Sequence, residues 1–242
     1  MTQSKVLILQ HVPWEKPGRI LDSLDDLGMS YEIANVAKEK KPDLPDFKEI
    51  SGVVIMGGPM GALDFDKYPG LKAEGKLARA AVSVGKPVLG VCLGHQIIAT
   101  VLGAKLKSGD APEIGFAPIK RIDKHDFFSM WNKTLDVLHW HNDVVTLPEG
   151  ATPLARSEKT KNQAFRFGSA LGLQFHLEVT PTLLDEWLDE PCMVKDLKAA
   201  GGSKSQLRDA FAEYNPQLQP MADQVFSGFA ARCSTYAATL ER

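Results

Sequence analysis

A cysteine between two glycines is the residue of this sequence whose setting points most directly to chemistry. Cys92 lies in the segment Gly90-Val-Cys-Leu-Gly94, directly after an apolar run and directly before a helical pattern. A turn of the form small-x-nucleophile-x-small between a strand and a helix strains its middle residue and exposes that side chain. The helix N-terminus that follows favours the thiolate. We therefore interpret Cys92 as a candidate nucleophile; the alternative is a buried structural thiol flanked by packing glycines.

A candidate base and a carboxylate to orient it occur together later in the chain. His176 and Glu178 belong to Gly172-Leu-Gln-Phe-His-Leu-Glu-Val-Thr180. If this segment is extended, residues two apart point to the same side, so the imidazole and the carboxylate lie next to each other. This is the base-and-orienter arrangement that a catalytic triad needs. The alternative is a surface histidine and glutamate at the end of a strand.

The elements that must position these residues alternate in the first half of the chain. The pattern predicts strands over 6–9, 31–36, 52–56 and 87–91, and helices over 17–28, 71–84 and 93–102. Continuous apolar strands alternating with helices are typical of a parallel sheet covered by helices on both faces. Cys92 then lies at the carboxyl end of a strand, where open α/β sheets bind their ligands.

In the second half of the chain, short strand-like segments follow one another with little helix between them. Strand-like pieces over 115–122, 135–140, 165–167 and 171–175 predict an antiparallel or mixed extension of the sheet. The pattern turns helical after Thr180, which can cap a helix, and the glycines at 201 and 202 interrupt it before Ser203, which can cap the next. Apolar residues at 221, 225, 229 and 233 form a stripe that should pack on the body. We expect one domain over 1–180 and a helical C-terminal extension over 181–242 packed on it.

Composition limits the classes of function. The 242 residues carry a formal net charge of −2, which gives no general attraction to nucleic acid or to membrane surfaces. No signal peptide and no membrane-spanning run is predicted. The three cysteines are far apart in the sequence, which disfavours a disulfide framework and favours the reducing cytoplasm.

The two motifs in combination resemble those of the class I glutamine amidotransferases, the triad Cys-His-Glu family, and in particular their GMP synthase-type members. The resemblance covers about residues 5–180 and implies a flavodoxin-like α/β fold. It implies that Cys92 is the nucleophile, His176 the general base and then acid, and Glu178 its orienter. The proline that the family usually has between the histidine and the glutamate is Leu177 here, which changes none of the reacting groups.

The resemblance also implies an oxyanion hole. Gly57-Gly-Pro59 follows an apolar strand and resembles the family's oxyanion strand, so the backbone N–H of Gly58 would join that of Leu93 in binding the oxyanion. The alternative is a simple Gly-Gly-Pro turn. His11 and Glu15 lie just past the first strand on the same side, either shaping the pocket mouth or serving as loop polar groups.

The remaining family positions would contact the substrate. Gln96 resembles the family glutamine that fixes the glutamyl group, although it could also bond within the first helical turn. His141 and Asp143 align with the Ser-His-Gly-Asp stretch that meets the amino-acid end of glutamine, with Asn142 in place of the glycine.

No metal or cofactor is expected. His139 and His141 share a strand face and could chelate an ion, but a third ligand is not evident in the sequence. Glu113-Ile-Gly115 resembles a short family signature and is assigned no chemistry. We interpret Cys192 and Cys233 as packing residues.

Three functions remain open on the sequence. The first is a glutaminase that releases ammonia from glutamine through a γ-glutamyl thioester and passes it to a synthase partner, because no phosphate-binding loop is present for activating an acceptor. The second is a hydrolase of γ-glutamyl peptides or conjugates. The third is a catalytically silent binding protein whose cysteine senses oxidants. The extension could cover the pocket, join two copies in a homo-oligomer, or dock a synthase.

Overall fold

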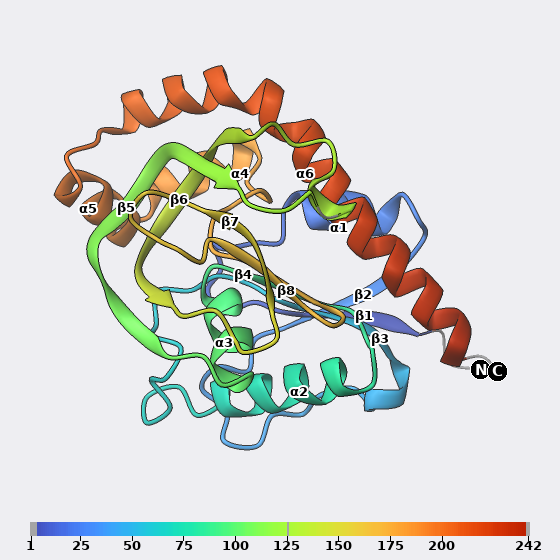
Figure 1. The fold of residues 1–242 in the computed structure, drawn as a ribbon. Helices are drawn as coiled ribbons and strands as arrows, with labels where there is room; N and C mark the ends of the chain where they lie inside the picture. Colours follow the sequence, from blue (N-terminus) through green and yellow to red (C-terminus); the bar gives the residue numbers. More distant parts are fainter. Residues whose placement is uncertain (1–3, 125, 241–242) are drawn as a thin grey trace.

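The structure, a computed structural model, describes residues 4–124 and 126–240. Among these residues, nine strands form one sheet in the order β2-β1-β3-β4-β9-β8-β7-β5-β6 (Figure 1). The strands are β1 Lys5–Leu9, β2 Ser30–Ala34, β3 Ile50–Ile55, β4 Val88–Val91, β5 Leu106–Arg121, β6 Thr134–Val145, β7 Thr152–Arg156, β8 Ala164–Phe167 and β9 Ala170–Leu173. The helices are α1 Arg19–Asp25, η1 Phe47–Glu49, α2 Leu71–Ser83, α3 Leu93–Val101, η2 Asp126–Phe128, α4 Pro181–Asp189, α5 Pro191–Ala199 and α6 Lys204–Leu240.

The sheet has a parallel part and an antiparallel part. Strands β2, β1, β3, β4 and β9 run parallel to one another. Strands β8 and β7 continue the sheet in antiparallel order, and β5 and β6 form a long antiparallel ribbon at its end. The prediction of a mostly parallel α/β sheet with an antiparallel extension is confirmed.

Helices cover both faces of the parallel strands, as Figure 1 shows, with α2 and α3 below the sheet and α1 and α6 above it. Successive strand residues therefore belong to different cores. Ile8 belongs to the same buried cluster as Phe229 of α6, whereas its neighbour Leu7 belongs to the cluster that contains Ile97 of α3. Burial on both faces explains why these strands are continuous apolar runs in the sequence.

The antiparallel part differs most from the prediction. Strand β5 begins at Leu106, well before the predicted start at 115, because its first residues are polar and largely exposed and so show no apolar pattern. Strand β7 is absent from the prediction, since it is short and Pro153 makes it resemble a loop. Strand β9 ends at Leu173, so His176 lies beyond the sheet and joins it only through an isolated bridge to Leu138.

The C-terminal helices begin where the sequence indicates. The side chains of Thr180 and Ser203 each accept a hydrogen bond from the backbone N–H three residues on, so both predicted caps are present. Helix α6 changes direction along its length (Figure 1), and Pro216 and Pro220 lie inside it, where each removes a backbone hydrogen bond. None of the helices in the described chain, α6 included, has the length and apolarity needed to traverse a lipid bilayer.

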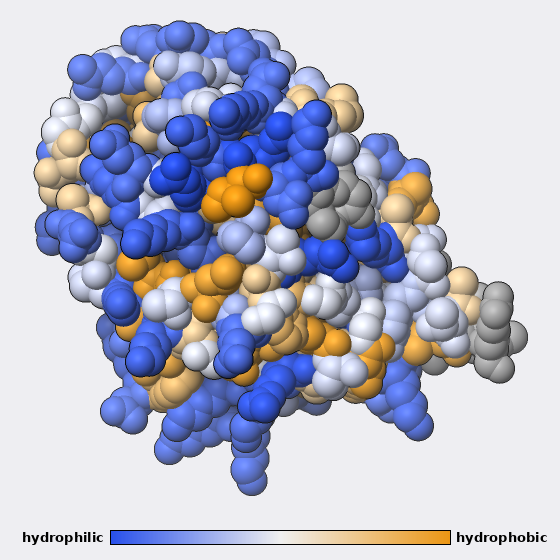
Figure 2. All heavy atoms as spheres, in the orientation of Figure 1, coloured by the Kyte–Doolittle hydropathy of each residue, from blue (hydrophilic) through white to orange (hydrophobic). Residues whose placement is uncertain are grey.

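The surface carries its apolar side chains singly or in small groups. On the face shown in Figure 2, hydrophilic residues separate the apolar ones, and no single apolar patch dominates. The large apolar residues that are about half exposed or more, such as Leu63, Val84 and Met130, lie in different parts of the chain. Isolated exposures of this kind are usual on folded proteins.

Candidate active site

The turn between β4 and α3 holds Cys92 in a strained conformation. Its φ of 51° is the only positive φ of a non-glycine residue in the described chain, and Leu93 begins α3 directly after it. A Cβ atom at Gly94 would lie 1.9 Å from the carbonyl oxygen of Ile55, and one at Gly90 would lie 2.5 Å from the backbone of Gly94. Only glycine fits at these two positions, so the pair of glycines is what allows the turn.

The second part of the site is the segment that follows β9. His176 Nδ1 lies 2.7 Å from Glu178 Oε1, and both residues are buried. The backbone N–H of His176 donates to the carbonyl of Leu138 on β6 at 2.8 Å, which fixes the segment although it is no longer a regular strand. The Nε2 atom of His176 has no hydrogen-bond partner among the described residues. Glu178 therefore occupies one ring nitrogen and leaves the other for proton transfer.

Charge couples the two parts of the site. Burial disfavours the charged form of His176, but Glu178 and Cys92 outweigh burial and raise the pKa of His176 well above its ordinary value. Burial raises the pKa of the Cys92 thiol, and the His176 imidazole lowers it in part. An imidazolium held next to a thiol is the arrangement that stabilises a thiolate nucleophile.

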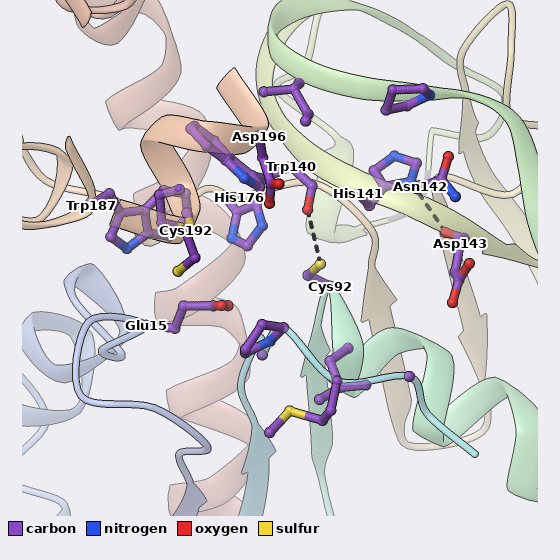
Figure 3. Close-up of a pocket in the computed structure, with 18 of the residues that line it drawn as sticks. Glu15, Cys92, Trp140, His141, Asn142, Asp143, His176, Trp187, Cys192 and Asp196 are labelled. Carbon is purple, nitrogen blue, oxygen red and sulfur yellow. Dashed lines mark hydrogen bonds between the residues drawn. The ribbon is translucent and has the colours of Figure 1, made fainter. Parts of the chain in front are cut away.

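Cys92, His176 and the side chains around them line one cavity of about 420 Å³, shown in Figure 3. The thiol of Cys92 donates to the carbonyl of Trp140 at 3.6 Å. The walls come from the loops after β1 and β3, the start of α3, strands β5 and β6, the segment after β9, and helices α4 and α5. The cavity thus lies at the carboxyl end of the parallel strands, where the sequence places it.

The loop after β3 approaches the cysteine turn closely. A Cβ atom at Gly58 would lie 2.9 Å from the end of the Leu93 side chain, so this side chain packs directly against the Gly58 backbone. Leu93 is the first residue of α3, and its N–H has no partner within the helix. His11 holds the loop after β3 in place through hydrogen bonds on both ring nitrogens. Its Nδ1 donates to the carbonyl of Gly57 at 2.8 Å, and its Nε2 lies 2.8 Å from Glu74 Oε2. Burial opposes the charge of His11, but Glu74 and Gly57 raise its pKa above the ordinary value.

The residues predicted to contact substrate all line this cavity, namely Gly58, Leu93, Gln96, His141 and Asp143. The amide of Gln96 donates to the backbone carbonyl of Asp143 at 3.0 Å and to Gln174 Oε1 at 3.2 Å. Gln96 therefore bonds across to β6 and not within its own helical turn. The Asp143 side chain is only partly buried.

Helices α4 and α5 supply a wall of the cavity that the sequence does not reveal. Trp187 of α4 packs edge-on against the His176 ring at a centroid distance of 4.9 Å. Cys192 and Asp196 of α5 also line the cavity. The prediction that Cys192 is a packing residue is wrong, because its side chain is exposed, whereas Cys233 is buried in the core as predicted. Neither α5 residue belongs to a recognisable motif, so only its position on the fold could identify it.

Glu15 is the other residue whose importance the sequence understates. Its carboxylate is buried at the cavity wall, and a Cβ atom at Gly57 would lie 1.9 Å from Glu15 Oε2. Burial raises the pKa of Glu15 to about 7, although the nearby His176 and His11 lower it. A loop glutamate is usually exposed, so the sequence alone favours the ordinary interpretation.

Two buried histidines and a glutamate form a second polar cluster next to the cavity. His141 Nε2 lies 3.4 Å from Glu113 Oε2, and His139 is two residue pairs further along the β5–β6 ribbon, on the same side of it. Burial lowers the pKa values of His139 and His141 to about 4. Burial opposes the charge of Glu113, but hydrogen bonds from Thr160 and Ser157 offset it and lower the pKa of that carboxyl.

The sequence is similar to that of a described family and of several relatives. The profile of "Glutamine amidotransferase class-I" matches residues 18–193. The glutamine amidotransferase-like protein YfeJ of Salmonella typhimurium is 33% identical over 184 residues, which cover 73% of this chain and 76% of that protein. One subunit of the glutamine-hydrolysing GMP synthase of Sulfolobus acidocaldarius is 34% identical over 167 residues, covering 67% of this chain and 84% of the relative.

Solved structures share the whole fold. A glutamine amidotransferase from Thermotoga maritima superimposes with a TM-score of 0.86 at 32% identity, covering 95% of this chain and 99% of that one. A glutamine amidotransferase from Methylobacillus flagellatus gives a TM-score of 0.80 at 26% identity, covering 97% and 95%. These alignments extend over nearly all of this chain, so they take in the C-terminal helices as well as the sheet.

Proposed function

Because this chain belongs to the class I glutamine amidotransferase family, we propose that it hydrolyses the γ-carboxamide of glutamine with Cys92, His176 and Glu178. One observation carries the proposal: Cys92 sits on a strained turn in the same cavity as a buried His176–Glu178 pair whose remaining ring nitrogen is unpartnered among the described residues. A nucleophile, a base and an orienting carboxylate are the groups that acyl transfer requires.

In the first half-reaction, the Cys92 thiolate attacks the γ-carbonyl carbon. The oxyanion that forms accepts hydrogen bonds from the backbone N–H groups of Gly58 and Leu93, and each such donor is worth about 2.7–4 kcal/mol in the transition state. Protonated His176 gives its proton to the departing nitrogen, the C–N bond breaks, and ammonia leaves. The γ-glutamyl group remains on sulfur as a thioester.

In the second half-reaction, neutral His176 takes a proton from water while the water oxygen attacks the thioester. The C–S bond breaks and glutamate leaves, which returns the imidazolium and the thiolate. Glu178 stabilises the charge on the ring in both steps through the hydrogen bond to Nδ1. Gln96, His141 and Asp143 hold the amino-acid end of the substrate in this proposal, since all three line the cavity. Figure 3 shows His141 and Asp143 on the side of Cys92 away from His176.

The ammonia passes to a synthase partner in this proposal. The relative from Sulfolobus acidocaldarius is named as one subunit of a GMP synthase, and such a name implies a second subunit in that enzyme. The acceptor that this chain serves follows from its partner and not from its own site.

A second candidate function is hydrolysis of γ-glutamyl peptides or conjugates. The cavity supports it, because it extends from the triad to Cys192 and Asp196 of α5 and has a volume of about 420 Å³. The chemistry at sulfur would be the same, with an amine leaving in place of ammonia.

The test supplies purified protein with glutamine and, separately, with γ-glutamyl dipeptides, and measures glutamate, ammonia and amine. We expect glutamate and ammonia from glutamine, loss of both in Cys92→Ala, and retention in Cys233→Ala. A preference for the dipeptides would replace the first function by the second. Comparable turnover by Cys92→Ala would overturn the mechanism for both, and no turnover of any substrate would favour the oxidant-sensing alternative.

A further inference from the structure

The second polar cluster brings three metal-ligating side chains together on one face of the β5–β6 ribbon. Glu113 and His141 are directly paired across the two strands, and His139 lies two residues along β6 on the same side. All three side chains are buried. One nitrogen or oxygen atom from each lies within 4.8 Å of the others. The third ligand that the sequence lacks is thus Glu113, which only strand pairing brings to the two histidines.

The hydrogen bonds of the two imidazoles leave their lone pairs facing inward. His139 Nε2 lies 3.2 Å from the carbonyl of Ala117, and His141 Nδ1 lies 3.2 Å from the carbonyl of Asp143. A carbonyl only accepts, so these two nitrogens carry the protons. The opposite nitrogens, His139 Nδ1 and His141 Nε2, have no hydrogen-bond partner among the described residues.

This arrangement places two acceptors against each other. The unprotonated Nε2 of His141 lies 3.4 Å from Glu113 Oε2. That carboxylate oxygen already accepts hydrogen bonds from Thr160 Oγ1 at 2.6 Å and from Gln163 Nε2 at 2.9 Å. In the other neutral tautomer of His141, Nε2 would carry the proton and could donate to Glu113. The unprotonated Nδ1 would then face the Asp143 carbonyl oxygen, which is also an acceptor. A cation between the imidazoles and the carboxylate removes the conflict, because both unprotonated groups can then bind it.

The spacing of the His141–Glu113 pair suits a small tetrahedral ion, and a nitrogen of His139 lies within 4.8 Å of both. Two ligands at about 2.0–2.1 Å from a tetrahedral centre are about 3.3–3.4 Å apart, which is the spacing of His141 Nε2 and Glu113 Oε2. Two imidazoles and a carboxylate are a ligand set that zinc accepts, with water in the fourth position. The N–H groups held by backbone carbonyls and the carboxylate held by Thr160 and Gln163 are the outer hydrogen bonds that metal ligands usually have.

We propose that Glu113, His139 and His141 bind one divalent transition-metal ion, with zinc the best match, in the wall of the active-site cavity. The cavity, which His141 also lines, would admit the ion and its water. The ion would join β5 to β6 directly after the register shift between Ser108 and Glu113. The site shares His141 with the proposed substrate pocket but contains neither Cys92 nor His176, so Cys92→Ala removes the proposed glutamine chemistry and leaves all three metal ligands in place.

The test measures metal content directly. Protein stripped with a chelator is dialysed against Zn²⁺, and bound zinc is counted by elemental analysis for the wild type, Cys92→Ala, Glu113→Gln and His139→Gln. We expect one zinc per chain in the wild type and in Cys92→Ala. In the two cluster variants we expect affinity to fall at least about tenfold.

Cobalt substitution of the unaltered protein provides a readout that does not depend on whether the variants fold. We expect the visible absorption of tetrahedral Co²⁺ without a sulfur-to-cobalt charge-transfer band, because the ligands are nitrogen and oxygen. The proposal is overturned if wild-type protein binds no stoichiometric zinc, if binding is lost in Cys92→Ala, or if a sulfur band shows that a cysteine is a ligand. Equal zinc affinity in the folded cluster variants would also overturn it.

Discussion

At the scale of single residues, Glu178 sets the protonation state of the site through one hydrogen bond to His176. Glu178→Gln keeps the shape of that side chain and removes its charge, so the pKa of His176 should fall. Because the wild-type pKa of His176 is raised, its imidazolium persists to higher pH than in the variant. We therefore expect the high-pH limb of kcat/KM to move to lower pH, with a loss of roughly 10²-fold or more in kcat.

The pH profile of glutamine hydrolysis by the two proteins checks this prediction. Glu186→Gln is the matched control, because Glu186 is an exposed carboxylate that pairs with Lys16 on the surface. An unshifted limb in Glu178→Gln would show that another group orients the histidine.

Glu15 gives a prediction about stability rather than rate. Its folded pKa of about 7 lies above the ordinary value of 4.5, so the folded state binds the proton more tightly than the unfolded state. This contribution to stability is complete below pH 4.5 and is lost as the pH rises to 7. Glu15→Gln has no carboxyl group to titrate at this position. Between about pH 4 and pH 8, its free energy of unfolding should therefore rise by roughly 3 kcal/mol relative to that of the wild type.

Urea unfolding of both proteins at several pH values measures the gain. A constant difference between wild type and Glu15→Gln across that range would mean that the carboxylate ionises as freely in the fold as in water.

The proposed catalytic residues can be singled out in the sequence because each belongs to a local pattern. Cys92 is marked by its two glycines, and His176 and Glu178 by their spacing. Glu15 and Asp196 carry no such mark, since an isolated acidic residue in a loop or helix is usually on the surface. Their place at the cavity follows only from how the chain folds.

At the scale of elements, the turn between β4 and α3 depends on the close approach of Gly94 to β3. A methyl group at Gly94 would collide with the carbonyl of Ile55, so Gly94→Ala should cost about 3 kcal/mol of stability and disturb the position of Cys92. Gly28→Ala is the matched control. Gly28 has a φ of 62°, but no atom lies within 4 Å of a Cβ added there. Gly28→Ala should therefore lower the stability only by the backbone strain, about 1–2 kcal/mol.

Denaturant unfolding and glutamine turnover of both glycine variants distinguish these costs. Equal destabilisation would mean that the turn relaxes to admit a side chain and that its strain is not needed.

Elements buried on both faces can be predicted well, and exposed ones poorly. Strands β1, β3 and β4 are apolar throughout, and the predicted ranges agree with them to within about two residues. The first half of β5 and all of β7 escape prediction, since exposed or proline-containing strands lack a hydrophobic period. The Glu113 cluster escapes prediction for a related reason, because it requires the β5–β6 pairing.

At the scale of the whole molecule, α6 contributes to the main core and should not unfold separately. Phe229 is 1% exposed and belongs to the same cluster as the strands of the parallel sheet. Phe229→Ala should destabilise the entire chain by about 3–5 kcal/mol in one cooperative transition. Leu240→Ala, at the exposed end of the same helix, should change stability by less than about 0.5 kcal/mol.

Calorimetry together with a denaturant titration followed by two probes checks this prediction. A separate early transition for the helices would instead indicate an independent C-terminal unit. The sequence predicts that the stripe on α6 packs on the body, but it cannot predict that α5 reaches the cavity. That placement depends on the breaks at Glu190 and at Gly201–Gly202, which set the direction of each short helix.

The nucleophile can be identified most directly with a glutamine analogue whose γ-carboxamide is replaced by a diazomethyl ketone. Such a compound alkylates the sulfur that attacks its carbonyl, and peptide mass spectrometry then locates the label. We expect one label per chain on Cys92, protection by glutamine, and loss of glutaminase activity in proportion to labelling. A label on Cys192, which lines the same cavity, or full activity after complete labelling of Cys92, would contradict the assignment.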